Sequence, residues 1–249
     1  MKSKEEGATL STYVISDLHG NLEAYHRMLK KINFQKDDVL YILGDVLDRG
    51  PNPIKLLLEI MAMPNVTCLL GNHELMALDC LEFLVQEITD MSIEAIDEKI
   101  LNNLLTWQYN GSKSTIDEFR KLNREMQQSV IEFIKEFPIY EEITVAGKEY
   151  LLVHAGGGYH PGKDIEEYTL KELVWDRAEY SIQYYPDVYL VTGHTPTQDI
   201  KDNPHPGYIY QANNHIAIDC GCCFPEGRLG CLRLDDMKEF YVETEEVNE

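Results

Sequence analysis

"GDVLDRG", residues 44–50, follows directly on the apolar run "VLYIL" at residues 39–43. A turn after a strand favours glycine, aspartate or asparagine, because these residues tolerate positive φ or bond locally to the backbone. A turn has no need for two aspartates and an arginine so close together, here Asp45, Asp48 and Arg49. On this stretch alone, an ordinary charged loop and a ligand-binding site both remain open.

The first third of the chain alternates between strand and helix patterns. Apolar runs predict strands, and the stretches between them predict helices, one of which has a proline near its start. The predicted strands are residues 12–16, 39–43 and 66–70, and the predicted helices are residues 22–32 and 53–62. Three apolar strands joined by helices indicate an α/β fold with a parallel sheet that is covered on both faces.

The remainder of the chain divides into a helical part and a second group of strands. Residues 74–137 repeat apolar side chains at intervals of three and four, which predicts a helical cap inserted into the sheet domain. Further strands are predicted at residues 139–145, 149–153, 189–192, 208–211, 216–219, 229–234 and 240–243. The sequence "AGKE" (146–149) predicts a hairpin, so this half is expected to be more antiparallel. The length of 249 residues and the absence of a linker predict a single domain, 1–249, that carries the cap.

The protein has 43 acidic and 22 basic residues and a formal net charge of -21. A field of this sign repels polyanions, so a nucleic acid duplex is not an expected partner. An anionic substrate can bind where local cations reverse the sign of the field, which makes metal ions worth considering.

No run approaches the roughly 20 apolar residues that cross a bilayer, and "MKSKEEGATLS" at the N-terminus has no apolar signal region. We therefore expect a cytoplasmic protein without a membrane partner, and no pattern indicates a partner subunit.

Six cysteines occur in the chain, at positions 68, 80, 220, 222, 223 and 231. Cys68 lies in a predicted buried strand, and "CGCC" (220–223) lacks the second C-x-x-C half that a zinc site would show. Reduced, partly buried thiols are therefore favoured over disulfides and over a metal cluster.

Polar clusters follow five of the predicted strands. They are "SDLHG" (16–20), "GDVLDRG" (44–50), "GNHE" (71–74), "LLVHAGG" (151–157) and "LVTGHTP" (190–196). Because the carboxyl ends of parallel strands open onto one crevice, these clusters are expected to converge. Taken singly, His19, His154 or His194 would be an ordinary hydrogen-bonded histidine, and Asn72 a turn residue. Taken together, they indicate a common site.

The converging side chains form a set of oxygen and imidazole donors. They are Asp17, His19, Asp45, Asn72, His154 and His194. Burying so many polar groups without partners is costly, whereas metal ions would satisfy them together. A two-metal hydrolytic site holds its ions ~3.5 to 4 Å apart and needs a bridging carboxylate, a role that suits Asp45. Two divalent ions are therefore expected. Because the set contains no thiolate, Mn²⁺ is favoured, with Fe or Zn²⁺ as alternatives. The remaining four histidines, at positions 26, 160, 205 and 215, are expected to be structural or surface residues.

These motifs resemble those of the metallophosphoesterase (calcineurin-like) superfamily, in particular its bacterial and phage phosphoprotein phosphatases. In order over residues 12–195, the matching motifs are Asp17-Leu18-His19-Gly20, residues 44–50, Gly71-Asn72-His73-Glu74, His154-Ala155 and Gly193-His194. The resemblance implies a two-sheet β-sandwich flanked by helices. It also implies Asp17 and His19 on a first metal, Asp45 as the bridge, and Asn72, His154 and His194 on a second metal.

Two further segments bear on the substrate. "VWDR" (174–177) resembles the segment in which small bacterial and phage phosphatases carry a second phosphate-binding arginine, so Arg177 joins Arg49 and Asn72 as a predicted substrate-binding residue. The ending "IDCGCCFPEGRLGCLRLDD" (218–236) instead resembles that of bis(5'-nucleosyl)-tetraphosphate hydrolases, close relatives with the same metal site. The active-site-rim segment of eukaryotic serine/threonine phosphatases is not found after Asp219, so their regulatory-subunit binding is not expected.

Each polar residue of "GDVLDRG" now has an expected role. Arg49 presents a fork of donors to phosphate, and Asp48 orients His73 and raises its pKa, which makes the two an acid pair. Metal-activated water attacks phosphorus directly, and His73 protonates the leaving group. The predicted enzyme is a serine/threonine protein phosphatase that hydrolyses a phosphorylated protein or a small phosphoester.

A dinucleoside tetraphosphate (Ap4A-type) hydrolase is the alternative enzyme. The C-terminal segment favours this alternative, whereas Asp48 favours the protein phosphatase, because the symmetrical hydrolases tend to lack that aspartate. A non-enzymatic scaffold is disfavoured, since every expected metal ligand is present.

Overall fold

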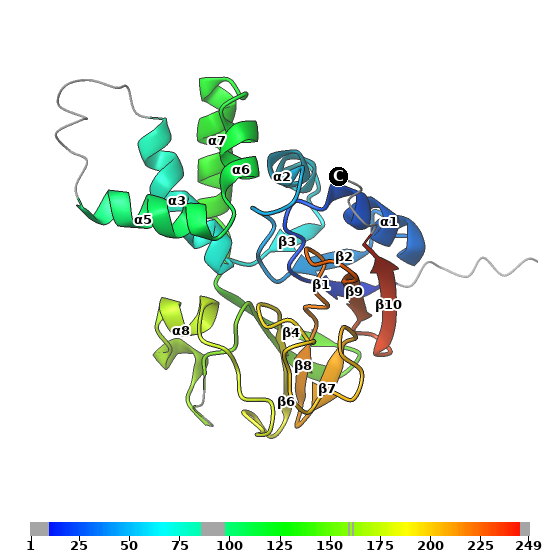
Figure 1. The fold of residues 1–249 in the computed structure, drawn as a ribbon. Coiled ribbons are helices and arrows are strands. Elements are labelled where there is room, and N and C mark those ends of the chain that lie inside the picture. Colours follow the sequence, from blue (N-terminus) through cyan, green and yellow to red (C-terminus); the bar gives the residue numbers. More distant parts are fainter. Residues whose placement is uncertain (1–9, 86–97, 159, 161, 245–249) are drawn as a thin grey trace, which may run out of the picture.

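Two β-sheets form the centre of the computed structural model, which describes residues 10–85, 98–158, 160 and 162–244 (Figure 1). The first sheet has the order β10-β9-β1-β2-β3 and consists of β1 (Thr12–Ile15), β2 (Val39–Ile42), β3 (Val66–Cys68), β9 (Arg228–Arg233) and β10 (Lys238–Glu243). The second has the order β4-β5-β6-β8-β7 and consists of β4 (Tyr140–Val145), β5 (Lys148–Val153), β6 (Val188–Thr192), β7 (Tyr210–Ala212) and β8 (His215–Ala217). The predicted α/β fold with two sheets is confirmed.

Apolar side chains from both sheets meet in the space between them. Val14 of β1 shares one buried cluster with Leu152 of β5 and Val191 of β6. Successive side chains of a strand point to opposite faces, so Tyr13 and Ile15 belong instead to the cluster that the helices cover. Burial on both faces explains why these strands are continuously apolar in sequence.

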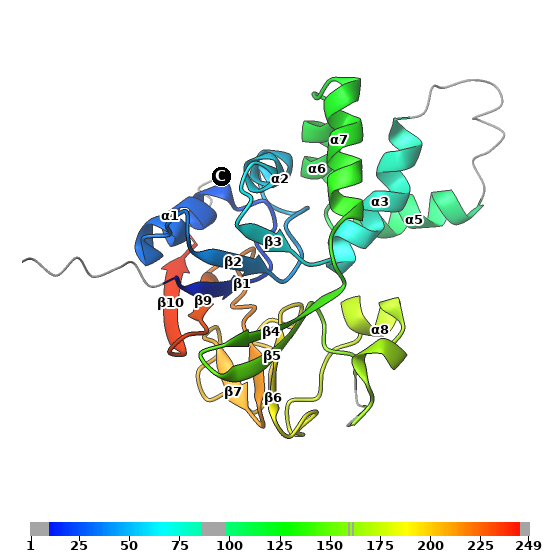
Figure 2. The same ribbon diagram turned by 180° about the vertical axis from the view of Figure 1, so that it is seen from behind.

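Helices α1 (Leu22–Ile32) and α2 (Pro53–Met61) join the parallel strands β1, β2 and β3, as predicted. α1 begins after Asn21, whose side chain accepts a hydrogen bond from the backbone N–H of Ala24 (3.0 Å). It ends at Asn33, which adopts the left-handed conformation. Both helices cover the outer face of the first sheet, as the two opposite views show (Figures 1 and 2).

The second sheet mixes antiparallel and parallel pairs. β4 and β5 form the predicted hairpin, and β7 pairs antiparallel with β8. β5, β6 and β8 are parallel to one another, although the sequence predicts a more antiparallel half. This parallel pairing brings the carboxyl ends of the three strands to one edge, where the loops after β1 and β2 also lie.

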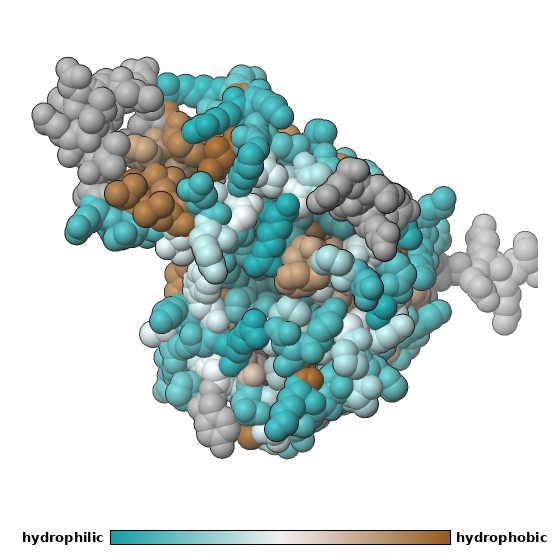
Figure 3. Space-filling view, viewed as in Figure 1, coloured by the Kyte–Doolittle hydropathy of each residue, from teal (hydrophilic) through white to brown (hydrophobic). Residues whose placement is uncertain are grey.

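Helices α3 (Asn72–Leu84), α5 (Glu98–Tyr109), α6 (Lys113–Phe119) and α7 (Arg124–Lys135) stand together beside the sheets (Figure 2). They occupy most of the predicted insertion, although α3 begins at Asn72 and residues 86–97 lie outside the described part. That these helices cap a single domain remains a prediction. Figure 3 shows apolar side chains on the surface of this region, where α5 exposes Leu101 and Leu105.

Two short elements were not predicted, the 3₁₀ turn Ile165–Glu167 and α8 (Leu170–Val174). α8 starts with a capping box in which Thr169 and Glu172 bond to each other's backbone N–H, a signature visible in the sequence.

Among the described residues, no helix has the length and apolarity needed to cross a membrane. All six cysteines are free thiols in the structure, and only Cys223 is not fully buried.

Candidate active site

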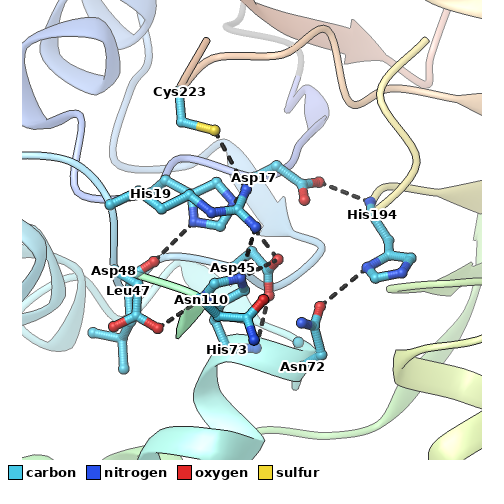
Figure 4. A network of polar contacts seen from close by, with 12 residues as sticks. Asp17, His19, Asp45, Leu47, Asp48, Asn72, His73, Asn110, His194 and Cys223 are labelled. Atoms are coloured by element: carbon cyan, nitrogen blue, oxygen red, sulfur yellow. Dashed lines mark hydrogen bonds and ion pairs between the residues drawn. The ribbon is translucent and has the colours of Figure 1, made fainter. Parts of the chain in front are cut away.

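The candidate residues gather where strands of both sheets end (Figure 4). Asp17 and His19 follow β1, Asp45 follows β2, His154 follows β5 and His194 follows β6. The first turn of α3, which follows β3, supplies two further residues of the "GNHE" motif. Most of these side chains line one cavity of about 380 Å³. The structure therefore brings the predicted set together.

Each histidine of the predicted ligand set donates one ring N–H to a backbone carbonyl. The pairs are His19 Nδ1 with Leu47 (2.9 Å), His154 Nδ1 with Leu43 (2.6 Å) and His194 Nε2 with Trp175 (3.0 Å). Such a bond fixes the tautomer and leaves the lone pair of the other ring nitrogen available. Metal-binding histidines in proteins are oriented in this way.

The available lone pairs of two histidines meet other acceptors. His154 Nε2 and His194 Nδ1 each lie 3.0 Å from Asn72 Oδ1, and His154 Nε2 lies 3.4 Å from Asp45 Oδ1. When both rings donate to backbone carbonyls, neither of these nitrogens carries a proton for the oxygens that it faces. A cation between them would satisfy all four atoms.

Asp45 faces histidines on both of its sides. Its Oδ2 lies 3.7 Å from His19 Nε2, whereas its Oδ1 is the atom near His154. Asp17 lies in the same cavity, and its Oδ2 accepts hydrogen bonds from the backbone N–H of His194 (3.0 Å) and from the hydroxyl of Ser16. The geometry is compatible with Asp45 as a bridging ligand.

The donors fit two divalent ions. Ligand atoms of His19, Asp45 and His73 form one group, and those of Asp45, His154 and His194 form another, with all atoms of a group within 4.8 Å of one another. The first group contains His73 where the sequence indicates Asp17. His73 is therefore within reach of a metal as well as of a leaving group, and its role needs an experiment that separates the two.

Burial and neighbouring charges disfavour the ionised forms of the candidate carboxylates and imidazoles. Burial and the nearby Asp219 raise the pKa of Asp17 well above its usual value, and burial with Asp17 does the same for the pKa of Asp45. Burial lowers the pKa of His194 to about 4 and that of His154 well below its usual range. Neutral imidazoles and crowded carboxylates are the forms that gain most from binding a divalent cation.

Six of the candidate residues have a left-handed backbone, with φ between 44° and 69°. They are Asp17, His19, Asp45, Asp48, Arg49 and His194. This conformation costs on the order of 1–3 kcal/mol for a residue other than glycine, and it persists where the surroundings impose it. Glycines relieve the crowding nearby, because a Cβ on Gly50 would lie only 2.0 Å from the carbonyl oxygen of His19.

The predicted contact between Asp48 and His73 is present and wholly buried, with 2.6 Å between Asp48 Oδ2 and His73 Nδ1. Its expected effect on the histidine is wrong, however. Burial and the Arg49 guanidinium hold the pKa of His73 well below its usual value instead of raising it. Burial also raises the pKa of Asp48 to about 7, so the negative charge of this carboxylate is itself disfavoured.

The guanidinium of Arg49 lies across the cavity. Its Nη1 donates to His19 Nε2 (2.9 Å), and its Nη2 donates to His73 Nε2 (3.0 Å). A metal on His19 would use the lone pair that accepts from Arg49, so the two interactions exclude each other. Arg177 also lines the cavity, but its side chain is 57% exposed and lies 3.3 Å from Asp199.

Sequence reasoning missed two buried acids. Glu74 accepts hydrogen bonds from the backbone N–H groups of Asp45, Val46 and Leu47 at 2.8 to 3.0 Å. Its position as the third residue of α3, within "GNHE", was the available signal for a helix-capping carboxylate. Asp219 lines the cavity at the end of β8 and repeats the pattern of a polar residue after an apolar strand.

The comparisons with known proteins place this fold and its cavity among the phosphoester hydrolases. The calcineurin-like phosphoesterase family model matches residues 10–207. This chain belongs to the calcineurin-like phosphoesterase family, whose members depend on two metal ions.

Individual relatives carry two kinds of name. The chain is 30% identical over 211 residues to serine/threonine-protein phosphatase 2 of Escherichia coli, with 79% of this chain and 85% of that protein covered. It is 33% identical over 117 residues to the symmetrical bis(5'-nucleosyl)-tetraphosphatase of Wigglesworthia glossinidia brevipalpis, of which it covers 43%. The crystal structure of a candidate diadenosine tetraphosphatase has the same fold, with a TM-score of 0.65, 15% identity and 96% of each chain covered.

Replacement of Glu74 tests whether this carboxylate holds the loop that carries Asp45. Glu74→Gln puts an amide NH₂ against buried backbone N–H groups, and each unsatisfied donor costs about 1–3 kcal/mol. We expect a loss of about 2–4 kcal/mol in the free energy of unfolding, measured by urea denaturation, together with reduced metal content.

Glu118→Gln is the matched control, because Glu118 accepts from the backbone N–H groups of Ile54 and Lys55 outside the cavity. It should lower stability without changing metal content. Wild-type metal binding and stability in Glu74→Gln would show that Glu74 does not support this loop.

Proposed function

We propose that this metallophosphoesterase is a serine/threonine protein phosphatase. The observation that carries the proposal is the buried 2.6 Å contact between Asp48 and His73. The alkoxide that leaves from phosphoserine needs a proton in the transition state, and an imidazole held by a carboxylate is suited to deliver it. Similarity to the E. coli phosphatase over 79% of this chain supports the same substrate class.

We propose two divalent metal ions in the cavity, with Mn²⁺ favoured over Fe and Zn²⁺. Asp17 and His19 would hold the first ion, and Asp45 would hold both ions. The second ion would be held by the remaining donors, Asn72, His154 and His194. Bound there, the ions would supply an activated water and positive charge for the phosphoryl oxygens. The support comes from the three oriented histidines and from the carboxylates that burial leaves in need of a cation.

The chain's own residues would bind the phosphoryl group and move the proton. Arg49, Arg177 and the amide of Asn72 line the cavity, where they would donate hydrogen bonds to phosphoryl oxygens. His73 would protonate the leaving oxygen from Nε2, which requires that Nε2 gain a proton and that Arg49 turn from this nitrogen to the phosphoryl group, while Asp48 holds the ring through Nδ1. A bound phosphate dianion favours the charged imidazole that this step requires.

A dinucleoside tetraphosphate hydrolase remains the second candidate. Cys223 and Phe224, from the C-terminal segment that resembles such hydrolases, line the same cavity, and the Phe224 ring lies 5.9 Å from the Arg49 guanidinium. Phe224 is 44% exposed, so its ring can stack on a nucleobase.

A parallel assay separates the two candidates. The values of kcat/KM for a phosphoserine peptide and for Ap4A should be measured with Mn²⁺ in wild type and in Phe224→Ala. A higher value for the peptide, unaffected by Phe224→Ala, is the expected result. A higher value of kcat/KM for Ap4A that falls in Phe224→Ala would favour the tetraphosphate hydrolase over the protein phosphatase.

The same proposal includes a cytoplasmic location. It also includes a phosphorylated protein or a small phosphoester as the substrate.

Metal removal tests the cofactor. Enzyme treated with EDTA should be inactive, and Mn²⁺ should restore activity better than Mg²⁺, because Mg²⁺ prefers an all-oxygen shell and retains its waters. Activity and metal content should be measured together, the latter by elemental analysis. Full turnover by protein shown to be free of metal would end the two-metal proposal.

His73→Asn tests the acid through the chemistry of the leaving group. The variant should lose roughly 10² to 10⁴ in kcat on a phosphoserine peptide and much less on p-nitrophenyl phosphate, whose leaving anion is stable without a proton. Asp48→Asn should also lower kcat more on the peptide than on p-nitrophenyl phosphate, but by a smaller factor. Asp45→Asn or His194→Ala should lower kcat on both substrates together. Equal losses on both substrates, with reduced metal content, would make His73 a metal ligand instead.

Arg177→Ala tests the second arginine. If Arg177 binds the phosphoryl group, the variant should raise KM and weaken phosphate inhibition by about tenfold, as expected for a lost charged hydrogen bond. The melting temperature should stay unchanged, because exposed ion pairs contribute little. Lys113→Ala is the control, since it removes an exposed pair with Asp117 outside the cavity. Unchanged kinetics in Arg177→Ala would leave Arg177 as a surface residue.

A further inference from the structure

The carboxylate of Asp48 is held by two side chains of the helical region as well as by His73. Trp107 of α5 donates its indole N–H to Asp48 Oδ2 (2.7 Å). Thr115 of α6 donates its hydroxyl to Asp48 Oδ1 (2.6 Å) and accepts from the backbone N–H of Asp48 (2.9 Å). All four side chains are wholly buried. Asp48 therefore has donors on both oxygens, and two of the three come from a segment remote in sequence.

The same segment also contacts the neighbour of Asp48. The backbone N–H of Arg49 donates to the carbonyl oxygen of Gly111, in the turn between α5 and α6 (3.0 Å). Asn110, from the same turn, lines the cavity with the candidate ligands (Figure 4). The end of "GDVLDRG" is thus attached to this turn by main-chain and side-chain bonds.

A purely structural role must be weighed against a functional one. Trp107 is the largest wholly buried side chain in the described residues, and a buried indole needs an acceptor wherever it lies. Packing does not require that this acceptor be Asp48, nor that Thr115 take its other oxygen. The hydrogen bonds from Trp107 and Thr115 restrict rotation of the Asp48 carboxylate, and this orients the His73 ring that is bonded to it.

We propose that Trp107 and Thr115 are positioning residues for the Asp48–His73 pair, through which α5 and α6 control how well the leaving group is protonated. They act through Asp48 and touch neither substrate nor metal. The proposal rests on the proposed role of His73 as the acid. It gives the helical region a part in the chemical step, beyond any effect on access to the cavity.

Thr115→Val is the first test, because valine has nearly the shape of threonine and lacks the hydroxyl. With metal content confirmed, kcat on a phosphoserine peptide should fall by about tenfold, a part of the roughly 10² to 10⁴ that a general acid supplies. The value on p-nitrophenyl phosphate should change less than about twofold. Thr115→Ser, which keeps the hydroxyl, should restore the peptide activity. Trp107→Phe, which removes the indole N–H, should show the same bias as Thr115→Val.

Ser112→Ala is the matched control. Ser112 lies in the turn between α5 and α6, and its hydroxyl is buried without a hydrogen-bond partner among the described residues. Its removal should leave the activity ratio of the two substrates at the wild-type value. A double variant supplies a second check, because Thr115→Val should add nothing in an Asp48→Asn background if Thr115 acts through Asp48.

A spectroscopic measurement is independent of turnover. The proton between His73 Nδ1 and Asp48 should give a downfield imidazole signal in the NMR spectrum, assigned by its loss in His73→Asn. Thr115→Val should shift or broaden this signal, and Ser112→Ala should not.

The outcomes distinguish the two levels of the proposal. If His73→Asn shows the leaving-group bias but Thr115→Val has wild-type kinetics and an unchanged signal, the positioning role is wrong and the acid stands. If His73→Asn shows no bias, the acid itself is wrong, and the positioning role is withdrawn with it. If Thr115→Val lowers both substrates equally, its effect is structural and the positioning role is also wrong.

Discussion

Carboxylates buried beside one another are the constraint on which the arrangement of this protein depends. Asp17, Asp45 and Asp219 are 3%, 2% and 4% exposed, and repulsion among them adds to the cost of their burial. Buried charges persist in proteins when cations or hydrogen bonds compensate them. The histidines around the cavity, each bonded through one nitrogen to a backbone carbonyl, present lone pairs and therefore increase the need for a cation.

The loops that carry these groups are held in strained conformations by other buried contacts. Asp45 and Asp48 both have positive φ. Glu74 accepts hydrogen bonds from the backbone N–H groups of Asp45, Val46 and Leu47, and it also accepts one from Gly71 at the start of its own helix. Such strain persists only where the surroundings over-determine the local structure. A carboxylate of α3 thereby couples the start of that helix to the shape of the "GDVLDRG" loop.

The helical region shares this loop with the sheets. Two of its side chains bond to Asp48, and the carbonyl oxygen of Gly111 bonds to the backbone of Arg49. Movement of α5 or α6 would therefore displace the residues that are proposed to bind phosphate and to supply the proton. In a protein with a net charge of -21, Arg49 and the proposed metal ions would provide the local positive charge that an anionic ester needs.

The sequence by itself determined the strands, the parallel βαβαβ order and the convergence of the polar clusters. Apolar runs that end in Asp, Asn or His report both burial and strand ends, and these are properties of local sequence. The sequence did not indicate the bonds of Trp107 and Thr115 to Asp48, because their partners lie 59 and 67 residues apart in the chain. Nor did it give the low pKa of His73, which depends on complete burial and on the neighbouring Arg49. Electrostatic shifts and long-range hydrogen bonds arise from the surroundings of a group, and only the tertiary structure decides what those surroundings are.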